Sequence, residues 1–367
     1  MSEIASTPLN NLHAEWGGKM TDFAGYRLPL SFAGGGFIAE HLHTRQNASL
    51  FDVSHMGQAI IAADAAAALS RLGPADVARI PVGGSKYTVL TLPNGGVMDD
   101  LIIGNDGERG FFLVFNAANK TRVLTHLRQH LPPSALQELD GRALVALQGP
   151  HAAAAVAAVA PDVLSLSFMH TAWFDFGGAD CRVMRGGYTG EDGFEFSLPA
   201  AAAEDFARLL AADDQVKPAG LGARDSLRLE AGLCLHGHEL DDNTSPIEAG
   251  LLWAIPPHRR QGGDYPGAEI IARQIAEGEP RRLVGLLPGG KKIARHGACL
   301  QNAAGKTIGQ VTSGLHSPSL QTAIALGYVL ADAASQAITA EVRGEWTPCT
   351  TVKLPFIAHN YHRGKSS

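Results

Sequence analysis

Turn-forming residues interrupt this chain at short intervals, and this spacing constrains its fold more than any other feature. The sequence contains 42 glycines and 20 prolines among 367 residues. Two turns have the pattern of a tight hairpin: residues 93–96, and Asn105-Asp106-Gly107 between the apolar runs 101–103 and 111–115. Segments this short favour a mixed protein with many strands over a helical bundle.

Strand-like and helix-like segments alternate up to about residue 280. The pattern predicts helices at 63–72, 119–131, 151–159 and 200–212, and from Ala223 onward. It predicts strands at 53–61, 88–92, 101–103, 111–115, 144–147, 172–176 and 181–185. Because hairpins recur among these segments in place of strict βαβ units, we expect an α+β architecture.

The composition changes after Trp253, where residues 256–263 form a basic, loop-like stretch. Short β-type runs with glycine turns follow, at 283–287, 308–312, 323–329, 338–342 and 350–353. Regularly spaced short strands predict a barrel-like domain. We therefore divide the chain into residues 1–280, with two interleaved α+β subdomains of which one is centred on 50–140, and a C-terminal β-barrel domain at 281–367.

Charge and apolar content exclude several classes of partner. The net charge is −6, so no overall basic field is present to attract nucleic acid or an anionic membrane. No run reaches the roughly 18 apolar residues of a membrane span. The four cysteines lie far apart, which suits a reducing compartment, and the first eight residues lack an apolar signal core. These features predict a cytoplasmic protein.

A pair of acids follows the glycine turn in Gly95-Gly96-Val97-Met98-Asp99-Asp100-Leu101. Strand alternation sends adjacent side chains to opposite faces, so one carboxylate can enter a cleft while the other does not. The plainer interpretation is a turn with two solvated acids, and the pattern leaves open which acid is functional. Adjacent acids lack the spacing of a glycosidase pair, so that activity is discounted.

Two further segments contain candidate binding residues. Glu195 lies between Phe194 and Phe196, and alternation turns it away from both rings; inside the protein it needs hydrogen-bond donors, which the edge of a pterin ring supplies. Arg224 lies near the start of a predicted helix, where the helix dipole disfavours a cation, so a carboxylate-binding role is indicated. The plainer alternatives are an outward-facing glutamate and an ion pair of Arg224 with Asp225 or Glu230.

The histidines offer a metal alternative, because His41-x-His43 and His236-x-His238 place two imidazoles two residues apart. Neither pair has a second recognisable set of ligands, so no metal site is predicted. Gly34-Gly35-Gly36 has neither the lysine of a phosphate-binding loop nor the spacing of a dinucleotide fingerprint, and is interpreted as a turn.

Taken in order, the motifs resemble the T protein family of the glycine cleavage system. The similarity covers essentially the whole chain. Its landmarks are Thr7-Pro8-Leu9, Asp22-Phe23-Ala24-Gly25-Tyr26, Pro29-Leu30, Phe51-Asp52-Val53-Ser54-His55-Met56, the segment from Gly95 to Leu101, Leu147-Gln148-Gly149-Pro150, the segments from Tyr188 to Glu195 and from Ala223 to Gly232, Thr312-Ser313-Gly314 and Ser317-Pro318-Ser319-Leu320. The chain departs from the family's pattern in the glycine-rich stretch 32–37, at His43-Thr44 and at Leu315-His316, none of which is a proposed catalytic position.

This resemblance implies a three-domain cloverleaf with two mixed α/β folate-binding domains and a C-terminal barrel. It implies transfer of the methylene of an S-aminomethyl-dihydrolipoyl carrier (H) protein to tetrahydrofolate, giving ammonia and 5,10-methylenetetrahydrofolate without a metal. It places the catalytic acid on Asp99. The implied folate-binding residues are Glu195, Arg224, Tyr361, Tyr188, Tyr87, Met56 and Asn116.

Two alternatives remain at this point. Another folate-dependent transferase or demethylase of the same fold has similar motifs, although the oxidases among these relatives carry a flavin domain whose dinucleotide fingerprint is missing here. A non-enzymatic folate-binding protein is the second alternative. Its relatives carry a Lys-Gly-Cys-type motif, whereas Cys234 is followed here by Leu-His-Gly-His.

Overall fold

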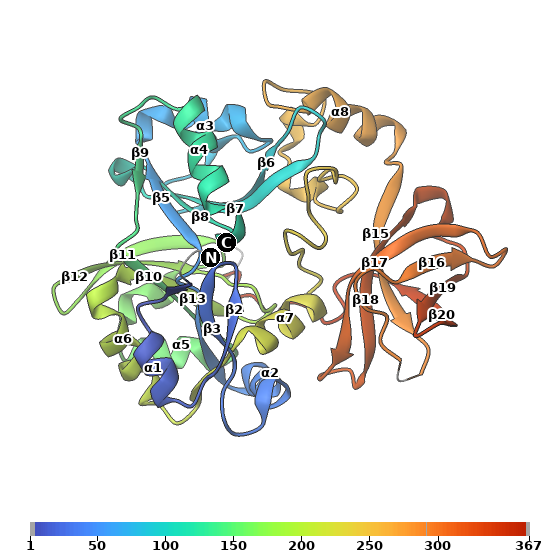
Figure 1. Ribbon diagram of the computed structural model, residues 1–367. Helices are drawn as coiled ribbons and strands as arrows, with labels where there is room; N and C mark the ends of the chain where they lie inside the picture. The colour runs from blue at the N-terminus through green and yellow to red at the C-terminus, as the bar shows by residue number, and fades with distance from the viewer. Residues whose placement is uncertain (1–3, 291, 365–367) are drawn as a thin grey trace.

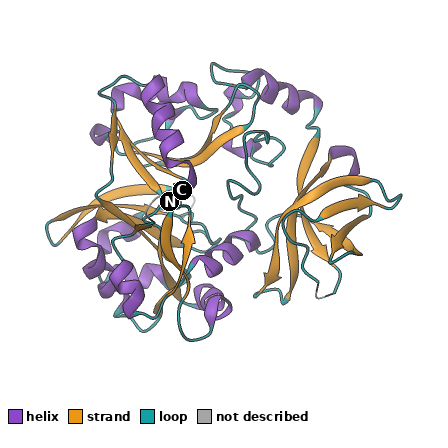
Figure 2. Cartoon of the chain, viewed as in Figure 1, coloured by secondary structure: helices purple, strands orange, loops and turns teal. Residues whose placement is uncertain are grey.

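The computed structural model describes residues 4–290 and 292–364. Three units built on β-sheets surround the centre of the molecule, and a small N-terminal sheet lies among them (Figure 1). Helices accompany the two larger sheets, while the C-terminal unit consists almost entirely of strands (Figure 2). The predicted α+β class and the predicted C-terminal barrel are confirmed.

The first unit is an antiparallel five-stranded sheet of order β6-β7-β8-β5-β9. Its strands are β5 (Gly57–Ile61), β6 (Ser85–Thr91), β7 (Val97–Asn105), β8 (Phe111–Phe115) and β9 (Leu136–Glu138). Its helices α3 (Ala66–Leu69) and α4 (Lys120–His130) cover one face, where Leu101, Ile103 and Leu113 pack with Val123 and Leu127. The helix predicted at 63–72 is a single α-turn flanked by 3₁₀ turns, because the chain must turn at Gly73-Pro74.

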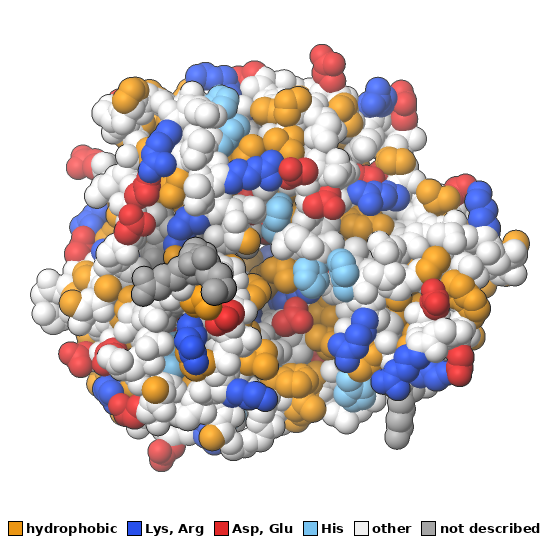
Figure 3. Space-filling view, in the orientation of Figure 1, with side chains coloured by type: hydrophobic (Ala, Val, Ile, Leu, Met, Phe, Trp, Pro, Cys, Tyr) orange, Lys and Arg blue, Asp and Glu red, His pale blue; other side chains and the backbone are white. Residues whose placement is uncertain are grey.

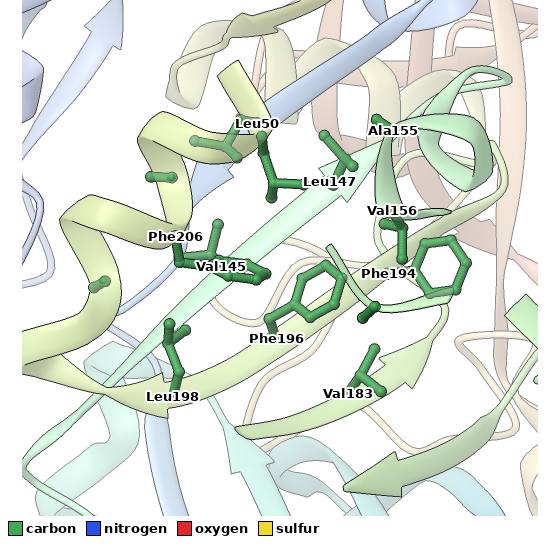
Figure 4. Close-up of a cluster of buried hydrophobic side chains, with 14 of the residues drawn as sticks. Leu50, Val145, Leu147, Ala155, Val156, Val183, Phe194, Phe196, Leu198 and Phe206 are labelled. Atoms are coloured by element: carbon green, nitrogen blue, oxygen red, sulfur yellow. The ribbon is translucent and has the colours of Figure 1, made fainter. Parts of the chain in front are cut away.

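The second unit is a six-stranded sheet of order β11-β12-β13-β10-β4-β14, antiparallel except for the parallel pair β4–β14. Its strands are β4 (Ala48–Asp52), β10 (Arg142–Gln148), β11 (His170–Phe176), β12 (Ala179–Arg185), β13 (Gly193–Pro199) and β14 (Val216–Pro218). Helices α5 (Ala152–Ala157) and α6 (Ala203–Ala211) cover its outer face. Phe194 and Phe196 of β13 pack there with Phe206 of α6 (Figure 4).

The two sheets pack against each other through their remaining faces. Phe112 and Val114 of β8 share one buried cluster with Leu144 and Ala146 of β10. Both sheets therefore have an outer face covered by helices and an inner face turned toward the other sheet. This division decides which side chains can meet at the centre of the protein.

The N-terminal segments, which the sequence patterns did not predict, complete this half of the molecule. They are β1 (Ala5–Ser6), α1 (Asn10–Glu15), β2 (Lys19–Phe23), β3 (Tyr26–Ser31) and α2 (Gly36–Gln46). Helix α7 (Leu221–Glu230) packs against α2 and β3. Helix α8 (Ala268–Glu277) precedes the barrel.

The C-terminal unit is a closed barrel of order β15-β18-β17-β16-β19-β20. Its strands are β15 (Arg281–Pro288), β16 (Cys299–Asn302), β17 (Thr307–Ser317), β18 (Thr322–Leu330), β19 (Ile338–Val342) and β20 (Glu345–Val352). The sequence predicted all of these but β16, which has four residues and a single buried apolar side chain, Leu300. The division of the chain at residue 280 stays a prediction, although β15 begins at Arg281.

No helix within residues 4–290 and 292–364 is long and apolar enough to cross a membrane.

Candidate active site

Asp99 and Asp100 lie on opposite faces of β7, as strand alternation predicts. Asp100 is on the inner face. Ile102, two residues further along β7 and so on the same face, pairs with Val114, which packs between the two sheets. Asp99 is on the outer face, beside the helix-covered core. The interpretation of the pair as two solvated acids is wrong, since Asp99 is 0% exposed and Asp100 is half-buried.

Amide groups hold Asp99 firmly. Its Oδ1 accepts hydrogen bonds from Asn116 Nδ2 at 2.8 Å and Asn119 Nδ2 at 2.7 Å, and its Oδ2 accepts one from the Asn116 backbone N–H at 3.1 Å. Burial and the neighbouring charge of Asp100 raise the pKa of Asp99 to about 6, against the effect of these hydrogen bonds. In this structure Asp99 has no exposed surface and lies behind Asp100.

Asp100 presents the accessible carboxylate. Its Oδ1 accepts a hydrogen bond from Asn116 Nδ2 at 2.7 Å, and its Oδ2 accepts one from the Tyr87 hydroxyl at 3.1 Å. Burial raises its pKa, while the charge of His236 and these hydrogen bonds lower it to a smaller extent. Asp100 therefore has the more accessible carboxylate of the two, while the assignment of the catalytic role to Asp99 stays a prediction.

Glu195 lies on the inner face of the opposite sheet. It pairs with Ala146 of β10 and is half-buried, whereas Phe194 and Phe196 point into the outer core. Burial raises the pKa of Glu195, and the charge of Arg224 opposes this shift. Glu195 makes no hydrogen bond or ion pair with any residue that the structure describes, so its carboxylate is available to a donor from outside the chain.

Arg224, in the first turn of α7, lies with its guanidinium 4.6 Å from the centre of the Tyr188 ring. Neither of its expected ion pairs forms, because Asp225 pairs with Arg228 and Glu230 pairs with Arg45. Within residues 4–290 and 292–364 the guanidinium of Arg224 makes no hydrogen bond, although its backbone N–H donates to the carbonyl oxygen of Gly220 at 3.1 Å. Burial lowers its pKa, while the charge of Glu195 acts in the opposite direction.

Tyr188, Tyr87 and Trp253 connect these charged groups. The Tyr188 hydroxyl donates to the carbonyl of Cys234, which packs in the same cluster as Tyr87. Tyr87 stacks on Trp253 with ring centres 5.3 Å apart. Trp253 is 64% exposed, and sequence analysis missed it because a lone tryptophan in a loop has no distinguishing pattern.

The other predicted folate-binding residues differ in how closely they join this group. Asn116 bridges the two acids, and the half-buried Met56 packs beside the inner cluster. Tyr361 stacks on Phe168 with ring centres 4.0 Å apart, while its neighbour Asn360 bonds to the carbonyl of Gly190. Tyr361 thus lies at the far end of the turn that carries Tyr188, and no described contact joins it to the acids or to Arg224.

We call the site formed by Tyr87, Asp100, Tyr188, Glu195 and Arg224 the central recess. All five side chains are half-buried, so solvent still reaches them. Figure 3 shows the molecular surface hollowed near the middle of this face, between the N-terminal units and the barrel. The recess combines two acids, one unpaired cation and aromatic walls, which suits a planar polar ligand with both donor and anionic groups.

Sequence analysis also missed Asn119 and His236 behind the acids. Asn119 Nδ2 lies 3.1 Å from His236 Nδ1, and His236 Nε2 lies 3.2 Å from the carbonyl oxygen of Val97. The other histidine pair, His41 and His43, makes contacts elsewhere. His41 contacts Ser226, Glu230 and Ser319, and His43 contacts the carbonyl oxygen of Gln215. Among the described residues, no group of three metal-binding side chains comes together.

Comparison with known proteins agrees with this architecture. The GCVT N-terminal domain family matches residues 9–259, and the glycine cleavage T-protein C-terminal barrel domain family matches residues 281–357. The chain is 43% identical to the mitochondrial aminomethyltransferase of Gallus gallus, over 99% of this chain and 95% of that protein. It is 41% identical to that of Homo sapiens, over 98% and 91%. The crystal structure of glycine cleavage system aminomethyltransferase T from Bartonella henselae superposes with a TM-score of 0.92 at 39% identity, covering 98% of this chain and 99% of that one.

These relatives correct one prediction. The sequence analysis predicted a cytoplasmic location, whereas the aminomethyltransferases of Gallus gallus, Homo sapiens and Schizosaccharomyces pombe are mitochondrial. The prediction rested on the absence of a recognisable leader in the first residues, and such an absence carries no information about location.

Proposed function

Because this chain belongs to the glycine cleavage T-protein family of aminomethyltransferases, we propose that its central recess binds tetrahydrofolate and receives the aminomethyl group of a lipoylated carrier protein. The reaction releases ammonia and yields 5,10-methylenetetrahydrofolate and the dihydrolipoyl arm. The similarity to aminomethyltransferases over nearly the whole chain supports this activity over that of another folate-dependent transferase or demethylase.

The observation that carries the proposal is the pair of unpartnered charges in the recess. Leaving Glu195 and Arg224 half-buried without an ion pair costs free energy, and such a cost is ordinarily offset by a ligand. A reduced pterin presents a ring edge with adjacent N–H donors for Glu195. The folate also has an anionic end, and the guanidinium of Arg224 suits a carboxylate.

The two acids supply the proton chemistry of this proposal. Both carboxylates have raised pKa values, so each binds a proton at a higher pH than an isolated acid does. Asp100, which faces the recess, would orient the reacting amine and exchange a proton with it. Asp99 would keep Asp100 in place through their shared partner Asn116.

Positioning provides most of the remaining acceleration. The one-carbon unit must meet two amine nitrogens while sulfur and ammonia leave, and holding these partners in attack geometry contributes about 7–11 kcal/mol at best. Tyr87 and Tyr188 would form the walls that hold the ring. Met56, Asn116 and Tyr361 complete the set of proposed folate-binding residues, with Tyr361 at the periphery.

The test measures ammonia release on mixing the chain with aminomethylated carrier protein, with and without tetrahydrofolate. We expect release to accelerate strongly when tetrahydrofolate is present. Turnover without any dependence on folate would contradict the proposal.

The matched variants Asp99→Asn and Asp100→Asn separate the roles of the two acids. The second variant should lose turnover while still binding tetrahydrofolate. If Asp100→Asn keeps near-normal turnover and Asp99→Asn does not, the role returns to Asp99.

A further inference from the structure

Lys120 is a cation beside the central recess for which the described residues provide no counter-ion. It is the first residue of α4 and directly follows Asn119, which holds Asp99. A lysine at this position is unfavourable, because the helix dipole is already positive there and the first turn of α4 contains no acid. Within residues 4–290 and 292–364, no carboxylate lies within ion-pair distance of its amine.

Aromatic side chains hold Lys120 in a defined position. Its Nζ donates a hydrogen bond to the Tyr26 hydroxyl oxygen at 2.7 Å and lies 5.0 Å from the centre of the Tyr26 ring. The Tyr26 ring in turn lies 6.3 Å from His55, and Phe23 contacts the same imidazole edge-on. Because the tyrosine oxygen accepts from the lysine, its own proton remains free to be donated to an anion.

Lys120 and the unpaired Arg224 flank the same histidine. His55 is 2% exposed, and its Nδ1 is buried without a hydrogen-bond partner among the described residues. Burial and the positive charges of Arg224 and Lys120 lower the pKa of His55 to about 4, against the opposing charge of Asp52. With His55 neutral, Arg224 and Lys120 supply the positive charge at this edge of the recess.

We propose that Lys120 and Tyr26 form a carboxylate subsite that binds the glutamate end of the folate whose pterin occupies the central recess. This inference rests on the function proposed above. Lys120 supplies the charge, Tyr26 supplies an O–H donor, and the N-terminus of α4 adds a favourable potential for an anion. The folate is favoured over an acidic group of the carrier protein because Lys120 and Tyr26 are half-buried and adjoin Asn119, which holds Asp99 directly behind the recess.

The test compares two ligands that differ only in their anionic end: tetrahydrofolate, and tetrahydropteroate, which lacks the glutamate. Dissociation constants are measured by calorimetry on the full-length chain and on Lys120→Met and Tyr26→Phe. We expect Lys120→Met to weaken tetrahydrofolate binding roughly tenfold, as loss of a charge-assisted hydrogen bond predicts, and to leave tetrahydropteroate binding unchanged. Tyr26→Phe should show a smaller change with the same ligand dependence.

Lys217→Met is the matched control, because Lys217 is an exposed lysine on β14 for which no described side-chain partner exists, and it should change neither constant. Equal weakening of both ligands by Lys120→Met, or an effect confined to the KM of the carrier protein, would overturn the inference. If the unaltered chain binds neither ligand, the proposed function fails. If it binds both and the variants do not distinguish them, only the subsite fails.

Discussion

The two ends of α7 hold charges in opposite states. Near its start, the described residues offer the guanidinium of Arg224 neither an ion pair nor a hydrogen bond, only the Tyr188 ring. At its end, Glu230 is 0% exposed and accepts hydrogen bonds from His41 at 3.0 Å, Arg45 at 2.9 Å, Ser317 at 2.5 Å and the hydroxyl of Ser319 at 2.8 Å. One helix of ten residues thus carries a charge that lacks partners and a charge that is surrounded by them.

This difference separates structural charges from ligand-binding charges. Ser317 is the last residue of β17 in the barrel, and Ser319 lies just after it. Glu230 therefore links α2, α7 and the C-terminal unit. A second carboxylate, Glu239, links α7 to the C-terminal unit, because it accepts hydrogen bonds from Arg228 of α7 and Thr312 of β17. We infer that these clusters fix α7 against the barrel and thereby hold Arg224 in place, while Arg224 itself keeps its binding capacity for a ligand.

The largest expected effect is on stability, at Glu230. Replacing Glu230 with Ala leaves Arg45 and His41 buried without their common partner, which should cost about 3–5 kcal/mol of unfolding free energy. Chemical denaturation monitored by circular dichroism measures this loss. A loss of unfolding free energy below about 1 kcal/mol would mean that the hydrogen bonds to Glu230 do not fix α7 against the barrel.

The same cluster predicts an acid limit to stability. Burial alone raises the pKa of Glu230, but its hydrogen bonds from His41 and Ser317 and the charge of Arg45 lower it to about 2, below the value of 4.5 expected for an unfolded chain. Its contribution is therefore present above pH 4.5 and is lost as the pH falls toward 2. Glu230→Gln should remove this part of the acid dependence.

Substitution of Asp100 should have the opposite effect to substitution of Glu230: a large loss of turnover and little loss of stability. Asp100→Asn removes the accessible carboxylate, and loss of an acid–base group typically lowers turnover by about 100-fold or more. Turnover is measured with saturating carrier protein and tetrahydrofolate. Denaturation of the same variant is the control, because a fall in stability as large as that of Glu230→Ala would make Asp100 a structural residue.

Two arginines allow the comparison to be made with one residue type. Arg224→Met should weaken tetrahydrofolate binding by about tenfold, in line with one charge-assisted hydrogen bond, and should leave the unfolding free energy nearly unchanged. Arg45→Met should destabilise the fold, because Arg45 bonds to both Glu191 and Glu230. Calorimetry gives the dissociation constant for tetrahydrofolate of each variant, and denaturation gives the unfolding free energy of each. If the two variants lose binding and stability in equal proportion, the distinction between the ends of α7 fails.

The sequence predicted individual strands well but not how the sheets meet. Alternation correctly placed Asp99 and Asp100 on opposite faces, and placed Glu195 opposite its flanking phenylalanines. Which face of β7 is inner depends on Val114 packing against Leu144, a contact between distant segments that no local pattern contains. The resemblance placed the catalytic role on Asp99, and the local pattern left open which of the two acids is accessible; the fold gives the accessible side chain to Asp100.

The same limit explains the missed positions. Asn119 and Trp253 carry no motif of their own and gain a role only from the fold that surrounds them, whereas Lys120, at the start of α4, shows the same local signal as Arg224 and was not singled out. Arg224 was identified because a cation in the first turn of a helix conflicts with the helix dipole, which is a local signal. Sequence reasoning therefore found Arg224 from a local signal and missed Asn119 and Trp253, whose roles depend on tertiary packing.

The smallest expected effect is a dependence of stability on pH that originates at Asp99. Its folded pKa of about 6 lies above the 3.8 of an unfolded chain, so the folded state binds the extra proton first, and stability should rise as the pH falls from 7 to 5. With these values the gain is about 1 kcal/mol. Other titrating groups contribute to the total, so the measured quantity is the difference between the unaltered chain and Asp99→Asn at both pH values. The unaltered chain should gain more stability than the variant on acidification, whereas parallel curves would mean that folding does not raise the pKa of Asp99.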